Sequence, residues 1–228
     1  MNMHRKPVPK ALFITGIGTD VGKSYATGWL AKEIAATGKS VITQKLIQTG
    51  NRDVSEDIEI HRRIMGIPMQ SVDLCRVTAP IILSYPASPH LAAKIDGIEL
   101  DYGVASAATD TLLNKYDHVL IEGAGGLMVP LKERYLTIDY ITGHKLPTVV
   151  VTNGRLGSIS DTLLTLSALA AAGADVFAVI YNPYFDKDKT IADETLGYLA
   201  AYVQEKFPDT LFLSMPADRS GRPFFKVF

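Results

Sequence analysis

Short apolar runs without polar alternation recur along the chain, a pattern typical of strands buried on both faces of a sheet. Segments with helical spacing lie between them. Helices are expected over residues 24–36, over 56–65, and from a cap at Ser158 or Ser160 to near Gly173. The alternation predicts a mostly parallel sheet with helices on both faces, in a single α/β domain over residues 1–228. The expected strands are 11–15, 40–45, 118–122, 148–152, 176–181 and, as a further candidate, 210–214.

The least regular part of the pattern is residues 69–97, which contain Pro80, Pro86 and Pro89. The segment is too long for a passive connection in a compact domain. Loops on a rigid scaffold often carry binding residues, so we expect this segment to contribute to a site. The alternative is that it only covers an edge of the sheet.

Composition excludes several classes of protein. Of the 228 residues, 47% are apolar and 21% are charged, which excludes a disordered scaffold. The formal charge of −1 gives no indication of nucleic acid or a membrane surface as a partner. No run approaches the roughly 18 apolar residues of a membrane span. The single cysteine, Cys75, cannot form an internal disulfide, which favours a cytoplasmic protein.

A glycine-rich loop follows the first strand directly. Five residues separate Gly16 from Gly22-Lys23-Ser24, one more than in the phosphate-binding pattern GxxxxGK[ST]. Glycines let successive backbone N–H groups point into one concavity, and the next helix adds the positive end of its dipole. The loop predicts a bound nucleoside triphosphate, with Lys23 on the outer phosphates and Ser24 on Mg²⁺. The alternative is a glycine turn that caps a helix and leaves Lys23 in solvent.

Three more polar side chains are expected at the carboxyl edge of the sheet, where open α/β folds bind ligands. Glu122 ends a strand before a glycine-rich turn and, together with Ser24, is a candidate for holding Mg²⁺, unless it is only a turn or cap residue. Asp57 is a similar oxygen donor, or else an acid favoured at a helix start. Lys45 ends the second strand, so two lysines would converge on one anion, as phosphoryl transfer requires. Otherwise Lys45 is a solvated strand-end lysine.

At these residues the sequence resembles the dethiobiotin synthetase family, which has a P-loop NTPase-like fold. The matched segments occur in family order and at family spacing, from residue 11 to about residue 218. They are Thr15 to Ser24 with the lengthened loop, Lys45-Leu-Ile-Gln48-Thr49-Gly50, Ser88-Pro89-His90-Leu91-Ala92-Ala93, Glu122-Gly-Ala-Gly-Gly-Leu-Met-Val-Pro130-Leu131, and Leu156-Gly157-Ser158-Ile159.

The resemblance implies a ligase of biotin biosynthesis that uses ATP, Mg²⁺ and CO₂ to close the ureido ring of dethiobiotin from 7,8-diaminononanoate. It implies Lys23, Lys45 and Thr19 as catalytic residues, with the lysines neutralising the γ-phosphate and a carbamate. Thr49 would bind the substrate, and its distant carboxylate would meet Leu156, Gly157, Ser158 and Ile159 at a homodimer interface. The implied metal ligands are Ser24, Asp57 and Glu122.

The implied ATP site covers several stretches of the chain. Asn182 is placed like the family's adenine-reading amide, and residues 216–218 like the segment that closes over adenine and ribose. The implied ATP-binding residues are Asp20, Val21, Gly22, Lys23, Ser24, Tyr25, Asp57, Glu122, Gly123, Ala124, Gly125, Asn182, Pro183, Pro216, Ala217 and Asp218.

The sequence departs from the family pattern at Ile17-Gly18, at Leu46 and at Ser160-Asp161, and an acid near a carboxylate site is unfavourable. Three rival interpretations fit less well. A partition-type ATPase switch would place a second lysine early in the loop, where this chain has residues 17–19. A cobyrinate-type amidase would need a glutaminase domain. A GTPase would need Asn-Lys-x-Asp, which the chain does not provide at Asn182.

Overall fold

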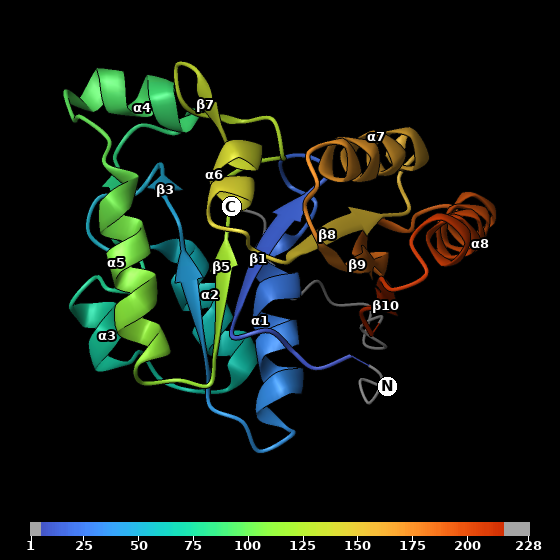
Figure 1. Ribbon diagram of the computed structural model, residues 1–228, viewed down its shortest axis with the longest axis horizontal. Helices are drawn as coiled ribbons and strands as arrows, with labels where there is room; N and C mark the ends of the chain where they lie inside the picture. Colours follow the sequence, from blue (N-terminus) through green and yellow to red (C-terminus); the bar gives the residue numbers. More distant parts are fainter. Residues whose placement is uncertain (1–5, 217–228) are drawn as a thin grey trace.

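The computed structural model describes residues 6–216, and its centre is a sheet of six parallel strands (Figure 1). All six predicted strands are confirmed, and the sheet order is β10-β9-β8-β1-β5-β2. Each neighbouring pair runs parallel. The strands are β1 (Ala11–Gly16), β2 (Val41–Lys45), β5 (His118–Glu122), β8 (Thr148–Asn153), β9 (Val176–Asn182) and β10 (Leu211–Ser214).

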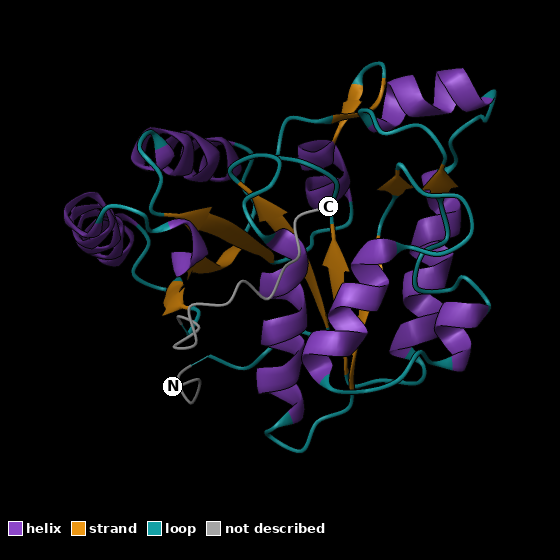
Figure 2. Ribbon diagram, turned by 180° about the vertical axis from the view of Figure 1, so that it is seen from behind, coloured by secondary structure: helices purple, strands orange, loops and turns teal. Residues whose placement is uncertain are grey.

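Helices cover both faces of this sheet, as the sequence predicts. On β1, Leu12 and Ile14 pack on the face covered by α1 (Lys23–Ala35) and α2 (Glu56–Met65), the face seen in Figure 2. Phe13 points to the opposite face and its separate apolar cluster. The other helices are α3 (Ser71–Leu74), α4 (Pro89–Asp96), α5 (Tyr102–Leu113), α6 (Thr137–Gly143), α7 (Ser158–Ala171), α8 (Lys189–Lys206) and a 3-10 turn, η2 (Pro183–Phe185).

The predicted helix ends differ in how they form. The helix at 56–65 has the predicted bounds, because Ser55 accepts a hydrogen bond from the Ile58 N–H and Gly66 ends the helix with φ of 73°. The prediction that Ser158 or Ser160 caps α7 is wrong. Gly157 is the cap residue, with φ of 96°, and the Ser158 hydroxyl donates instead to Asn153 Oδ1 at 2.7 Å.

The segment 69–97 is more regular than predicted. It contains α3, the short strand β4 (Ile82–Leu83) and α4, whose first turn begins with Pro89. β4 pairs in parallel with β3 (Gln48–Thr49), while β6 (Pro130–Lys132) and β7 (Tyr135–Leu136) form a second small sheet. The two-residue strands β3 and β4 are too short to leave a periodic pattern in the sequence.

A buried ion pair fixes this segment to α2 and β2. Arg62 donates to both oxygens of Asp73, from Nε at 2.9 Å and from Nη2 at 2.7 Å, and also to Thr43. Thr78 and the Gln70 N–H also donate to the Asp73 carboxylate. Burial raises the pKa of Asp73, but the bonds from Arg62 and Thr78 outweigh it and hold the pKa below its usual range.

Arg62→Ala is expected to lower the free energy of unfolding by about 3–5 kcal/mol, because it leaves the Asp73 carboxylate buried without its partner. Urea unfolding followed by circular dichroism measures the change. Arg63→Ala is the matched control, since Arg63 is exposed on the same helix and should change stability by less than about 0.5 kcal/mol. A loss of under 1 kcal/mol in Arg62→Ala would contradict the structural role given to this pair.

Candidate functional site

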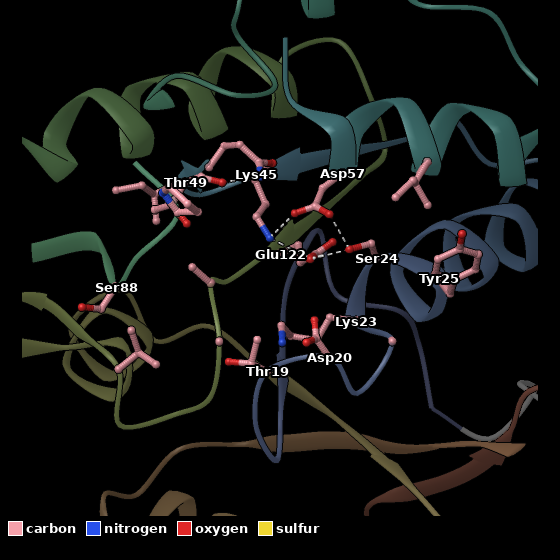
Figure 3. Close-up of a pocket in the computed structure, with 18 of the residues that line it drawn as sticks. Thr19, Asp20, Lys23, Ser24, Tyr25, Lys45, Thr49, Asp57, Ser88 and Glu122 are labelled. Atoms are coloured by element: carbon pink, nitrogen blue, oxygen red, sulfur yellow. Dashed lines mark hydrogen bonds and ion pairs between the residues drawn. The ribbon is translucent and has the colours of Figure 1, made fainter. Parts of the chain in front are cut away.

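A cavity of about 1010 Å³ opens at the carboxyl edge of the sheet (Figure 3). Its wall combines the glycine-rich loop, the ends of β2 and β5, the start of α2, residues 86–89 and the turn after β9. Thirteen residues expected at the site line it: Thr19, Asp20, Gly22, Lys23, Ser24, Tyr25, Lys45, Thr49, Asp57, Glu122, Ala124, Gly125 and Asn182.

The loop between β1 and α1 has a backbone suited to anions. Asp20 and Gly22 both have positive φ, at 55° and 89°. Helix α1 begins at Lys23, which lines the cavity. Lys23 Nζ donates to the Gly18 carbonyl at 2.8 Å, so the ammonium already lies across the loop. A phosphate in the loop would meet backbone N–H groups, a helix N-terminus and this ammonium together.

Asn182 holds the loop from the opposite side. Its Nδ2 donates to Val21 O at 3.1 Å, and its Oδ1 accepts from the Tyr184 N–H at 3.1 Å. A Cβ on Gly22 would lie 2.1 Å from this Nδ2, so only glycine fits beside the amide. The side chain lines the cavity, but two of its hydrogen-bonding groups are engaged with the protein backbone, and an adenine-reading role stays a prediction.

Four charged or polar side chains from four elements meet at the centre of the cavity (Figure 3). Lys45 Nζ lies 2.6 Å from Asp57 Oδ2 and 2.8 Å from Glu122 Oε1. The Ser24 hydroxyl lies 2.7 Å from Asp57 Oδ1 and 3.0 Å from Glu122 Oε1. Lys45 and Glu122 are register partners on the neighbouring strands β2 and β5, so sheet pairing itself brings their side chains together. We call Ser24, Lys45, Asp57 and Glu122 the central cluster.

Burial and neighbouring charge set the pKa values of this region. Burial raises the pKa of Glu122, but Lys45 and a hydrogen bond from His61 outweigh it and hold the pKa well below its usual range. Burial lowers the pKa of Lys45, yet Asp57 and Glu122 keep it above its ordinary value. Lys23 has no such pairing, and burial together with Lys45 lowers its pKa to about 8. At neutral pH Glu122 is therefore a carboxylate and Lys45 an ammonium, with Asp57 and Lys23 beside them.

The donor set of the central cluster fits a hard divalent cation. Ser24, Asp57 and Glu122 present one hydroxyl and two carboxylates toward a common point, and Mg²⁺ prefers oxygen ligands together with water and substrate phosphates. Within residues 6–216, His, Cys, Asp and Glu side chains do not gather in threes as a metal site, so Ser24 is the third protein donor.

Sequence reasoning missed several residues of the cavity wall. Arg155 follows β8, and its guanidinium lies 3.8 Å from the ring centroid of Phe185 in the turn after β9. Both positions follow the carboxyl end of a strand, and that placement alone is a signal for a binding residue. The missed lining residues are Ile60, Arg155, Tyr184 and Phe185. Residues 86–89 lie in the segment 69–97, which contributes to the site as expected, and Ile47, Gln48 and Val129 lie in matched segments without an assigned role.

Other expected site residues lie away from the cavity wall of this chain. Leu156 is 88% exposed, and residues 156–159 do not line the cavity; Val21, Gly123 and Pro183 flank it without lining it. Pro216 is exposed at the end of the described chain, and Ala217 and Asp218 lie outside the described residues. Their assigned roles remain predictions.

The first strand of the parallel sheet leads through a glycine-rich loop into α1, and Lys23 and Ser24 lie at the start of that helix. This arrangement defines a P-loop nucleotide-binding protein. The family model AAA_26, described as an AAA domain, matches residues 10–215. An ATP-dependent dethiobiotin synthetase of Pasteurella multocida is 48% identical, covering 89% of this chain and 95% of the relative. Another, from Haemophilus ducreyi, is 45% identical, with 90% and 98% covered. The chain belongs to the ATP-dependent dethiobiotin synthetase family.

Solved structures agree on the fold. A putative plasmid partition protein from Borrelia burgdorferi B31, bound to AMPPNP, superposes with a TM-score of 0.54, covering 97% of this chain and 93% of that one. Its sequence identity is only 13%, so this likeness shows the P-loop α/β fold alone. Within the described residues, no helix combines the length and apolar character needed to cross a bilayer.

Gly22→Ala is expected to weaken nucleotide binding by at least about tenfold, because the new Cβ collides with Asn182 and an L-residue at φ of 89° is strained by about 1–3 kcal/mol. Gly38→Ala is the control: its φ is 83°, and its Cβ would meet nothing within 4 Å. Isothermal titration with a nucleoside triphosphate compares the two. Equal affinity in both variants would show that the contact between Gly22 and Asn182 does not shape the loop.

Nucleotide binding at pH 9 is expected to take up a proton at Lys23. Because the pKa of Lys23 is lowered to about 8, most of the Lys23 side chain is the neutral amine at pH 9. A bound phosphate favours the charged ammonium and so restores the proton. At pH 6.5 the group is charged beforehand and no uptake at Lys23 should occur. Titration calorimetry in buffers of different ionisation enthalpy counts the protons, and Lys23→Arg, which stays charged, should lose the uptake. The same uptake in Lys23→Arg would assign it elsewhere.

Proposed function

We propose that the chain, acting as the single P-loop α/β domain predicted over residues 1–228, forms dethiobiotin from 7,8-diaminononanoate, CO₂ and ATP, releasing ADP and phosphate. The observation that carries the proposal is the central cluster, where Lys45 is held between Asp57 and Glu122 beside the phosphate loop. Membership of the dethiobiotin synthetase family supplies the reaction, and the cluster supplies side chains suited to it.

The reaction needs three steps with anionic groups. One amine attacks CO₂ and loses a proton, giving a carbamate. A carbamate oxygen then attacks the γ-phosphorus of ATP, releasing ADP and leaving a carbamic-phosphoric anhydride. The second amine attacks the carbonyl carbon, closes the ring and expels phosphate. Negative charge lies at the carbamate and the transferring phosphoryl group, so fixed ammonium groups there would lower the barrier.

Lys23 and Lys45 would provide that positive charge from two sides. Lys23 lies across the phosphate loop and would turn from the Gly18 carbonyl to the outer phosphates. Lys45 lies deeper, where its ammonium would face the carbamate. Thr19 on the loop and Thr49 on β3 line the same cavity and would orient the substrate between the lysines. Holding the reacting groups in this geometry would contribute much of the rate increase.

Ser24, Asp57 and Glu122 would hold Mg²⁺, which would shield the charge of the triphosphate. These residues have the convergent oxygen atoms that such a role requires. The adenine and ribose would lie near Asn182, Pro183 and the segment Pro216-Ala217-Asp218. Arg155 and Phe185 extend the cavity wall on that side.

The substrate carboxylate would bind at the start of α7, at residues 156–159, and the working form would be a homodimer in the cytoplasm. Leu156 is 88% exposed and lies outside the cavity wall of one chain, which agrees with a carboxylate site completed between two subunits. The backbone N–H groups at the N-terminus of α7 suit a carboxylate. Small molecules, with neither nucleic acid nor membrane, would be the partners.

Phosphate release from MgATP with bicarbonate tests the reaction. Phosphate should appear only when 7,8-diaminononanoate is present, and mass spectrometry should find one dethiobiotin per phosphate. Omission of bicarbonate under CO₂-free conditions is the control. Hydrolysis that ignores the diamine and responds to a protein partner would instead support a partition-type switch, the rival with the same fold.

Lys45→Ala is expected to lower the rate of ring closure by about 10²–10³-fold or more, because one fixed charge at the reacting anion is lost. The fold should be retained, as checked by circular dichroism. Lys39→Ala, at an exposed lysine just before β2, is the matched control and should react normally. Near-normal turnover in Lys45→Ala would remove Lys45 from the mechanism.

Glu122→Gln is expected to weaken Mg²⁺-dependent nucleotide binding while keeping the shape of the side chain. The amide removes one of two carboxylates that would face the cation, so the Mg²⁺ concentration for half-maximal nucleotide binding should rise by about tenfold or more. Glu133→Gln, at an exposed position between β6 and β7, is the control. Unchanged MgATP affinity and rate in Glu122→Gln would assign Glu122 to structure alone.

A further inference from the structure

A buried histidine lies directly behind Glu122. His61 is on α2, one helical turn after Asp57, and its side chain has no exposed surface. His61 Nε2 lies 2.6 Å from Glu122 Oε2, while His61 Nδ1 lies 2.9 Å from Thr43 Oγ1. The other Glu122 oxygen, Oε1, faces Ser24 and Lys45. The histidine thus contacts the carboxylate on the side away from the cavity.

The neighbouring arginine determines which hydrogen bonds are possible. Arg62 Nη1 lies 2.7 Å from Thr43 Oγ1, and a guanidinium can only donate. The Thr43 oxygen therefore accepts from Arg62, and its single proton is available for His61 Nδ1. If His61 Nδ1 accepts this proton, the histidine proton must be on Nε2, where it is donated to Glu122 Oε2. This arrangement gives a partner to each hydrogen-bonding group along the path from Arg62 through Thr43 and His61 to Glu122 Oε2.

The opposite neutral tautomer would not fit. A proton on Nδ1 alone would place the lone pair of Nε2 2.6 Å from a carboxylate oxygen, which is repulsive, and would leave both groups without a partner there. Unsatisfied buried polar groups cost about 1–3 kcal/mol each.

We propose that His61 is a positioning residue, oriented by Thr43 and Arg62, which donates from Nε2 to Glu122 Oε2 and fixes Glu122 so that Oε1 faces the cavity. The proposal rests on the proposed role of Glu122 toward Mg²⁺. A carboxylate that can rotate about its last bond would present either oxygen, whereas one anchored at Oε2 presents a single oxygen in a fixed direction. Partners of this kind, behind a metal ligand, commonly alter metal affinity or activity by 10–100-fold.

The anchor continues into the buried ion pair described above. Asp73 holds Arg62 through two hydrogen bonds, so the direction of the Arg62 to Thr43 bond is fixed in turn. A row of buried contacts therefore runs from α3 through α2 and β2 to Glu122 on β5. Thr43, Arg62 and Asp73 do not line the cavity, yet they are buried and hydrogen-bonded as parts of this row.

Nitrogen NMR of ¹⁵N-histidine protein, without metal or nucleotide, tests the donor directly. His61 should show a protonated Nε2, assigned by the signals that disappear in His61→Gln. An unprotonated Nε2 would overturn the proposal. This measurement uses the wild-type chain, so it does not depend on whether a variant folds.

Two isosteric variants test the positioning role. The amide nitrogen of Gln reaches the place of His Nε2 and can still donate to Glu122, whereas the amide of Asn reaches only the place of Nδ1. The Mg²⁺ concentration for half-maximal nucleotide binding should rise by about tenfold or more in His61→Asn, and by less than about threefold in His61→Gln. Circular dichroism and the thermal midpoint verify that both variants are folded.

Equal impairment of the two variants would overturn the proposal, because loss of packing would affect both alike. Failure of the proposed reaction is a separate result. If the wild type makes no dethiobiotin while the protonated Nε2 and the contrast between Asn and Gln hold, the reaction is wrong and the positioning role stands.

Discussion

The site depends on one electrostatic constraint: two carboxylates removed from water must be compensated. Lys45 meets this requirement at 2.6 Å from Asp57 and 2.8 Å from Glu122, and Glu122 is buried almost completely. A buried ion pair of this kind adds little net stability over an apolar core, but loss of one partner is strongly destabilising. The cluster places cationic and anionic side chains at adjacent points of the cavity wall.

The rest of the fold supports this cluster. Parallel pairing of β2 with β5 places Lys45 opposite Glu122, and the first turn of α2 brings in Asp57. The packing of α2 against α1 brings Asp57 next to Ser24. Behind them, Arg62 holds the polar row that reaches Glu122. A change in any of these packing contacts would move an oxygen or a nitrogen of the cluster, so the stability of the fold and the geometry of the site are closely linked.

Much of this could be predicted from the sequence. Continuous apolar runs identified the six strands, and the loop at Lys23 identified the phosphate site. Residues at strand ends, such as Lys45 and Glu122, could be placed together because parallel strands end at one edge. The two-residue strands β3, which contains Thr49, and β4 could not be predicted, since they leave no periodic pattern. His61 was missed because nothing in the sequence places it behind Glu122, which is on a distant strand, although its spacing of four residues from Asp57 was a usable signal.

The most direct test of the account is whether Lys45 holds the carbamate before any phosphate is transferred. Wild-type protein with 7,8-diaminononanoate, Mg²⁺ and ¹³C-bicarbonate, but without nucleotide, should show a ¹³C carbamate signal bound to protein. Lys45→Met, verified as folded, should show only the carbamate that free diamine forms in solution. A bound carbamate signal of equal size in Lys45→Met would contradict the central role given to the buried ammonium.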